Sequence, residues 1–191
     1  MEPESTARTL PLPAIEIHTL DAEAYRAAIP ALADLILDAV AAGASITFLA
    51  DVTHTEASAW WEARQADVAG GVVSPFVAVR DGSVVGSALL TRSTKANSPH
   101  RAEIEKVIVH RSARRRGIAS ALMRAAEEQA RSEGRWLLVL DTVTGSPADA
   151  LYRSLGWRET GMVPNYAMLP DGTPAAATFF WKDLREEGEG R

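Results

Sequence analysis

The chain has 191 residues, a formal net charge of −5 at pH 7 and no cysteine. This length suits one folded domain, which we expect at 15–184 between flexible tails at 1–14 and 185–191. The acidic balance argues against a nucleic-acid binder, whose binding face is normally basic. The missing cysteines exclude a disulfide framework, a cysteine-based metal site and a thiol nucleophile. With no secretory signal pattern and no membrane-spanning apolar run, we expect a cytoplasmic protein that does not bind a membrane.

The N-terminal part of the chain predicts one strand followed by two helices. Ile15-Glu16-Ile17 alternates as a strand does, and apolar residues then recur at helical spacing from Tyr25 until Gly43. A second helix is expected from Thr55 to Val68. Its neighbours Trp60 and Trp61 cannot face the same way, so one ring is expected in the core and the other along a groove.

A hairpin is predicted next, from Val77 to Gly86, with its turn at Asp81-Gly82. Gly86 is expected to mark a bulge or a close backbone approach. The polar segment from Ser93 to His100 is predicted to be a loop between strands.

The most informative segment is a turn that follows the apolar strand end Val107-Ile108-Val109 and opens an amphipathic helix. The first amides of a helix lack intrahelical partners and lie at the positive end of its dipole, so they bind phosphate. Glycine allows close approach, and guanidinium groups pair with phosphate oxygens. The predicted phosphate site comprises Arg114, Arg115, Arg116, Gly117, Ile118, Ala119 and Ser120. A solvated arginine-rich helix start, or a basic patch for nucleic acid, is the alternative.

A second strand, turn and helix follow. Trp136 to Thr142 is typical of a buried parallel strand. Ser146 is a plausible N-cap and Pro147 suits the first helical position. The helix reads A-x-x-L-Y-x-x-L-G-W, with Tyr152 at its centre.

These two segments resemble the signatures of the GNAT superfamily of N-acetyltransferases, the first as R-x-x-G-x-A and the second as the tyrosine helix. The expected order, β-α-α-β-β-β-α-β-α-β-β, is the GNAT order. We therefore expect the GNAT fold, an α/β (α+β) architecture with a mixed central sheet flanked by helices. Between about Tyr25 and Lys182, further segments resemble the tabtoxin-resistance acetyltransferases, which acetylate the amino-acid-like antimetabolite tabtoxinine-β-lactam.

The resemblance implies acetyl-CoA as co-substrate. It implies that main-chain groups of Val107 and Val109 pair with the pantetheine arm, and that the Val109 amide polarises the thioester carbonyl. Ile108 lies in the same stretch and counts among the cofactor-binding residues. Gly145 stands where many superfamily members carry asparagine, so Ser146 is expected to take over that cofactor contact. The histidines match no metal-ligand spacing, and we expect no metal.

Tyr152 is the candidate general acid for the departing thiolate and is also expected at the cofactor. A phenol is protonated at neutral pH and can donate its proton. The alternative is an amphipathic packing residue between helix and sheet.

Three carboxylates are candidate bases for the attacking amine. Glu103 and Glu105 are expected to share a strand face with Val107 and Val109, and Asp141 lies at the carboxyl end of the next parallel strand, where ligands gather. The tabtoxin-resistance group implicates residues matching Glu103 and Asp141, so these two are favoured. The alternative is ordinary strand carboxylates paired with Arg101 or Lys106.

The sequence thus predicts an enzyme, an N-acetyltransferase acting on a primary amine of a small, amino-acid-like molecule, possible targets being a toxin or antibiotic. Direct attack in a ternary complex is expected, with the protein a monomer or homodimer and no nucleic-acid partner. A protein or peptide N-acetyltransferase and a non-catalytic acyl-CoA-binding module remain alternatives. A wide groove would favour a peptide, and a closed pocket near Trp60, Trp61 and Pro164-Asn165-Tyr166 a small molecule.

Overall fold

The computed structural model describes residues 14–186. The predicted tails lie mostly outside this range, although Arg185 lies 3.6 Å above the Trp136 ring. In chain order the elements are β1 (Glu16–Thr19), α1 (Ala22–Ala41), α2 (His54–Glu62), α3 (Gln65–Ala69), β2 (Val73–Arg80), β3 (Ser83–Arg92), β4 (Arg101–Val109), η1 (Arg111–Ala113), α4 (Ile118–Ser132), β5 (Leu137–Val143), α5 (Pro147–Ser154), β6 (Arg158–Met168) and β7 (Pro174–Asp183).

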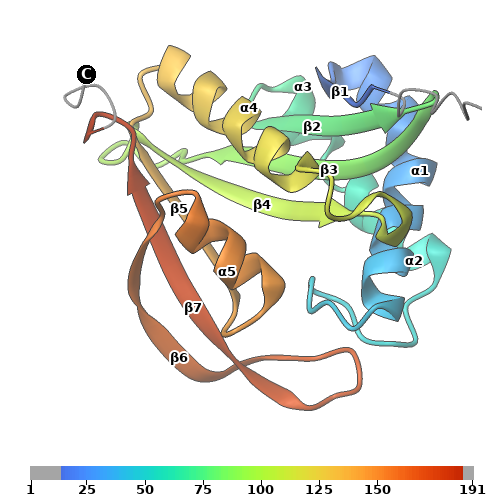
Figure 1. Cartoon of the computed structure of the whole chain (residues 1–191). Coiled ribbons are helices and arrows are strands. Elements are labelled where there is room, and N and C mark those ends of the chain that lie inside the picture. Colours follow the sequence, from blue (N-terminus) through green and yellow to red (C-terminus); the bar gives the residue numbers. More distant parts are fainter. Residues whose placement is uncertain (1–13, 187–191) are drawn as a thin grey trace, which may run out of the picture.

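The strands form one seven-stranded mixed sheet in the order β1-β2-β3-β4-β5-β7-β6 (Figure 1). β4 and β5 are parallel, and the other neighbouring strands are antiparallel. The predicted fold class and element order are confirmed, with α3 and the short η1 as additions. None of the helices in residues 14–186 combines the length and the hydropathy that crossing a membrane requires.

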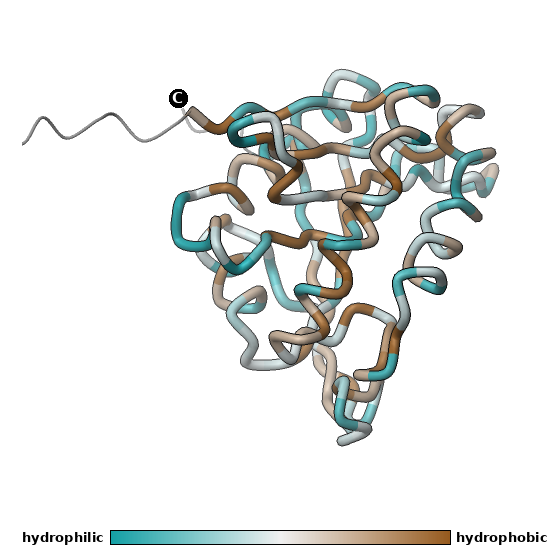
Figure 2. The backbone as a smooth tube through the Cα atoms, turned by 90° about the vertical axis from the view of Figure 1, so that its right-hand side faces the viewer, coloured by the Kyte–Doolittle hydropathy of each residue, from teal (hydrophilic) through white to brown (hydrophobic). Residues whose placement is uncertain are grey.

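Each face of the sheet has its own core. The α4 core, on the side of α4 and α5, includes Phe76, Leu90, Ile104, Leu122, Leu140 and Phe180. The α1 core, on the side of α1 and α2, includes Tyr25, Leu32, Trp61, Val77, Leu89 and Ile108. Hydrophilic and hydrophobic residues alternate along the covering helices (Figure 2), which is how an amphipathic helix packs on a sheet.

The predicted helix from Thr55 to Val68 is wrong as a single element, because the chain breaks between α2 and α3. The Arg64 amide bonds back to the Trp61 carbonyl, three residues earlier, at 3.0 Å, which tightens the backbone and ends α2. The two tryptophans separate as predicted. Trp61 is fully buried in the α1 core, whereas Trp60 is half-buried.

Two glycines have the roles that the sequence indicated. Gly82 (φ 73°) follows Asp81 (φ 50°) in the β2–β3 turn, the backbone of a type I′ hairpin. At Gly86 an added Cβ would lie 3.0 Å from the Ile108 carbonyl oxygen and 3.2 Å from Ile118 Cγ2. The close approach expected at Gly86 is therefore confirmed, and it lets the first turn of α4 pack directly on β3.

The two parallel strands separate soon after they meet. β4 pairs with β5 from Arg101 to Glu103 against Leu137 to Val139, and the rest of β4 pairs with β3 alone. From there β5 continues beside β7, so the sheet opens between β4 and β5 (Figure 1). This opening exposes one edge of β4 directly before the turn into α4.

Candidate functional site

The turn before α4 has the backbone shape of an anion site. Arg115 (φ 60°) and Gly117 (φ 76°) are left-handed, and α4 starts without a side-chain cap. A Cβ built on Gly117 would meet no atom within 4 Å, so the space in front of the first helical amides is open. Left-handed turns at an uncapped helix start turn several N–H groups toward one point. The turn therefore fits the pyrophosphate predicted for it.

Asp38, on α1, holds this turn in place. The Arg111 amide donates to Asp38 Oδ2 at 2.9 Å, the Arg111 guanidinium donates to Oδ1, and His110 Nε2 lies 3.3 Å from Oδ1. Burial alone would raise the pKa of Asp38, but the Arg111 hydrogen bonds and the His110 charge lower it. Asp38 carries no local signal in the sequence, because its partner Arg111 lies 73 residues away in a different element.

The arginines of the turn do not act alike. Arg114 Nε donates to the Val109 carbonyl at 3.1 Å, and its guanidinium lies 4.0 Å from Asp38 Oδ2. Arg115 and Arg116 are exposed and make no hydrogen bond or ion pair within residues 14–186. The latter two are therefore free to meet an anion, while Arg114 helps to shape the turn.

The open edge of β4 presents main-chain groups at alternate residues. The His110 amide donates to Val85 on β3 at 2.9 Å, so the main-chain groups of Val109 and Val107 face away from β3 by alternation. This orientation fits the strand-like pairing that the resemblance implies. The side chain of Ile108 is buried, and its main chain faces β3 by the same alternation.

A bulge in β4 overturns the expected side-chain pattern. From Ser87 to Leu89, β3 advances by two residues, whereas the paired segment of β4, from Ile108 to Glu105, advances by three. The extra residue of β4 is accommodated at Lys106, which has a φ of 51°. Val107 and Val109 consequently pack against the α4 core. Glu103 and Glu105 lie on the opposite face, that of α1 and α2, because their neighbour Ile104 belongs to the α4 core. The prediction that all four residues share a face is wrong, because the extra residue inverts the alternation.

The bulge brings Lys106 onto the face that carries the carboxylates. Its Nζ donates to Thr47 Oγ1 at 2.9 Å and lies 4.5 Å from the centre of the Trp60 ring. The Arg64 guanidinium lies 3.3 Å from that ring. Lys106 was named in the sequence only as a neutralising partner, and a bulge at a non-glycine residue leaves no clear sequence signal.

Glu103, Glu105 and Asp141 share this face. Asp141 lies there because Leu138 and Leu140 on β5 point into the α4 core. Within the described residues, the three carboxylates make no hydrogen bond or ion pair, so the expected alternative of pairing with Arg101 or Lys106 is not observed. Burial and the neighbouring carboxylate charges raise the pKa of Glu103, and burial raises the pKa of Asp141. Carboxylates held without partners can accept a proton or attract a cation.

Tyr152, in α5, belongs to the α4 core, on the face of the sheet opposite the carboxylates. Its ring is 5% exposed and packs against Trp157 and Phe180, with centroids 6.2 and 6.0 Å apart. Burial and the charge of Asp141 raise the pKa of Tyr152, so its hydroxyl stays protonated at neutral pH. Ser146 caps α5 by accepting the Asp149 amide at 3.2 Å, with Pro147 next to it, as predicted.

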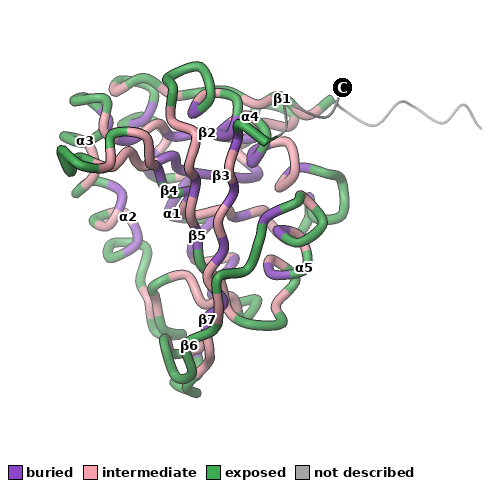
Figure 3. Tube along the Cα trace, turned by 90° about the vertical axis from the view of Figure 1, so that its left-hand side faces the viewer, coloured by how far each residue is buried: buried purple, intermediate pink, exposed green. Residues whose placement is uncertain are grey.

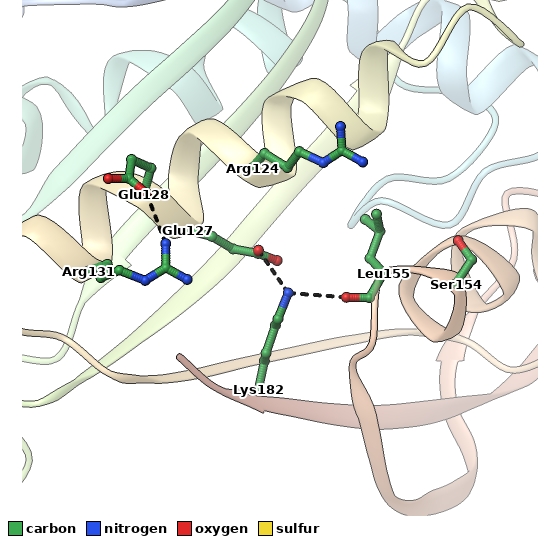
Figure 4. Close-up of a pocket in the computed structure, with 7 residues that line it drawn as sticks. All are labelled: Arg124, Glu127, Glu128, Arg131, Ser154, Leu155 and Lys182. Atoms are coloured by element: carbon green, nitrogen blue, oxygen red, sulfur yellow. Dashed lines mark hydrogen bonds and ion pairs between the residues drawn. The ribbon is translucent and has the colours of Figure 1, made fainter. Parts of the chain in front are cut away.

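A cavity of about 450 Å³ lies between α4 and the end of α5, and the ion pair of Glu127 and Lys182 lines it (Figure 4). Lys182 Nζ donates to Glu127 Oε2 at 2.9 Å and to the Leu155 carbonyl at 3.1 Å, and Trp157 Nε1 donates to Glu127 Oε1 at 3.0 Å. These bonds join α4, the end of α5 and β7. We call this hydrogen-bonded group the α4–β7 joint, and it fixes the end of the helix that carries Tyr152.

The segment between α1 and α2 spans the carboxylate face. Ser45 Oγ donates to the Met168 carbonyl at 2.8 Å, and the Ala50 amide donates to the Pro170 carbonyl at 2.9 Å. Both acceptors belong to β6 or the turn after it. Among the described residues, no group of three or more histidine, aspartate or glutamate side chains is arranged to hold a metal ion.

The comparisons with known proteins agree with this geometry. The acetyltransferase (GNAT) family model matches residues 38–157. A GCN5-related N-acetyltransferase from Kribbella flavida is 26% identical, with a TM-score of 0.72 over 90% of this chain and 98% of its own. A Salmonella typhimurium protein solved with its cofactor acetyl-CoA is 25% identical, with a TM-score of 0.70 over 90% and 94%. A ribosomal-protein-alanine N-acetyltransferase from Brucella melitensis is 28% identical, with a TM-score of 0.70 over 88% and 99%.

Proposed function

This chain belongs to the GNAT family of acetyltransferases and uses acetyl-CoA, and we propose that it acetylates the primary amine of a small, amino-acid-like molecule. We further propose that the reaction detoxifies a toxin or antibiotic, as in the tabtoxin-resistance group, and takes place in the cytoplasm, where acetyl-CoA is available.

The observation that carries this proposal is the set of unpaired carboxylates on the face of β4 and β5 that α1 and α2 border. Glu103, Glu105 and Asp141 attract a cationic amine. The 44–50 segment is hydrogen-bonded across to β6 and its turn, which opposes the passage of a long peptide. A small ammonium-bearing molecule fits both features.

The chain's own groups have separate roles in this proposal. Acetyl-CoA supplies the activated acetyl group. The Arg114–Ser120 turn holds the pyrophosphate with its amides, and the Val109 amide is the donor aimed at developing negative charge. Asp141 or Glu103 accepts the proton that an ammonium must lose before it attacks. The hydroxyl of Tyr152 holds the proton that a departing thiolate requires. Because the chain has no cysteine, we propose direct attack with both substrates bound.

An acceptor panel tests the proposal by free-thiol release from acetyl-CoA. The panel contains tabtoxinine-β-lactam, free amino acids, a polyamine and peptides with free N-termini, since the Brucella melitensis neighbour is named for a protein substrate. Turnover of an amino-acid-like compound is the expected result. Turnover of peptides alone would replace the proposal with a peptide acetyltransferase. CoA binding in calorimetry without turnover of any acceptor would replace it with a non-catalytic acyl-CoA module.

A further inference from the structure

Lys106 stands out as a cation that the roles above leave unused. Its left-handed backbone (φ 51°) is strained for a non-glycine residue, and the Ser87 hydroxyl donates to its carbonyl at 3.0 Å to hold the bulge. Strained backbone of this kind persists where surrounding structure enforces it, commonly at ligand sites. The bulge turns an ammonium group toward the carboxylate face.

The surroundings of the ammonium group are built from three different elements. Thr47 lies in the 44–50 segment, Trp60 in α2, and Arg64 stacks on the same Trp60 ring. An ammonium group has three donors, and within residues 14–186 its one hydrogen bond goes to Thr47. Donors therefore remain for an anionic partner.

Charges of opposite sign are kept apart on this face. Lys106 makes no ion pair within 4.0 Å with Glu103, Glu105 or Asp141 in the described structure, although all four groups influence one another electrostatically. A ligand with an amine near one end and a carboxylate near the other would satisfy both sides. A plain amine would leave Lys106 without its anion.

We propose that Lys106 is a specificity-determining residue that binds the carboxylate of the acceptor, so that the enzyme selects zwitterionic amines. Arg64, which stacks on the same Trp60 ring, adds positive charge to that end of the site. This inference rests on the proposed function and names the feature by which the acceptor is recognised.

The test compares lysine with lysinamide and cadaverine, which keep the amine and lack the carboxylate. Calorimetry on the CoA-bound enzyme gives the Kd of each probe, and thiol release gives kcat and KM. We expect lysine to bind about 10- to 100-fold more tightly than the other two, the range for one hydrogen bond to a charged group. In Lys106→Met this preference should fall to within about threefold.

Two further variants separate recognition from folding. Lys106→Arg keeps the charge on the same backbone and should retain most of the preference for lysine. Lys95→Met removes an exposed lysine from the 93–100 loop and should retain all of it. Equal affinity for lysine and lysinamide in the unmodified enzyme, or a preference that survives Lys106→Met, would overturn the inference and leave the acetyltransferase activity standing. No thiol release with any amine would instead overturn the proposed function.

Discussion

The sheet has two parts that are covered differently. β1 to β4 lie between α1–α3 on one face and α4 on the other, whereas β5, β7 and β6 have α5 on one face only. In Figure 3, β3 is mostly buried, β4 is mostly intermediate with some buried positions, and β6 is exposed along most of its length. Large apolar side chains of β6 remain exposed, among them Met162, Val163, Tyr166 and Met168.

Under the proposed function, this difference separates two tasks. The doubly covered part fixes the turn before α4 through Asp38 and the packing of α4 on Gly86, as a site for an invariant cofactor requires. The singly covered part supplies Asp141 and the residues beyond it, where an acceptor can be bound and exchanged. The opening between β4 and β5 lies where the two parts meet (Figure 1).

Breaking the ion pair between Glu127 on α4 and Lys182 on β7, which joins the two parts, should have the largest effect on stability. Glu127 and Lys182 are each 8% exposed, and Lys182→Met leaves a buried carboxylate without its cation. We expect a loss of about 3–5 kcal/mol in the free energy of unfolding, measured by urea denaturation. Arg158→Met breaks an exposed pair with Glu186 and should cost about 0–1 kcal/mol.

A double variant sharpens this test. Adding Glu127→Gln to Lys182→Met removes the stranded charge and keeps an oxygen for the Trp157 indole, so more than half of the loss should return. A loss under about 1 kcal/mol in Lys182→Met alone would show that the pair contributes no more than an exposed ion pair does.

Tyr152→Phe should have the next largest effect. It removes the hydroxyl and retains the ring packing, so we expect kcat to fall about 100-fold and the CoA Kd to stay within about twofold. Tyr25→Phe is the matched control, because its hydroxyl donates to the Trp61 carbonyl at 2.8 Å inside the α1 core. Unchanged turnover in Tyr152→Phe would exclude the acid role.

Gly117→Val tests the cofactor turn. Its Cβ and methyl groups would enter the open space in front of α4, so we expect the CoA Kd to rise about 30-fold in calorimetry, equivalent to the loss of about one or two strong hydrogen bonds. Gly134→Val is an equally strained control, since Gly134 has a φ of 72° and is also open, at the other end of α4. If both variants lose CoA affinity equally, strain rather than phosphate contact is responsible.

Glu103→Gln should have the smallest effect on stability, and it should raise the free energy of unfolding, whereas Lys182→Met lowers it. Because burial raises the pKa of Glu103, the folded state binds its proton more tightly than the unfolded chain, and stability falls as pH rises through that raised pKa. Removing the titration should raise the free energy of unfolding at pH 7 only slightly, since solvent reaches Glu103 and screens its charge, while activity falls. Thermal unfolding at pH 7 should show the gain, and near pH 4 it should vanish. A destabilised variant at pH 7 would contradict this.

Local patterns in the sequence predicted most of the helices and strands. The strand, turn and helix around Gly117 and the capped helix after Ser146 were predicted because each signal lies within a few residues. The break of α2 at Arg64 was missed, since the apolar pattern continues through it and the tight turn depends on backbone bonding.

The sequence by itself indicated the family and the element order, and it singled out the residues that we propose for the diphosphate, because these follow from short-range spacing and helix-end chemistry. Tertiary structure decided which face each side chain occupies. One inserted residue at Lys106 inverts the alternation of β4, and Asp38 meets the turn from 73 residues away. Register and long-range contacts arise from packing whole elements together, so a linear pattern does not encode them.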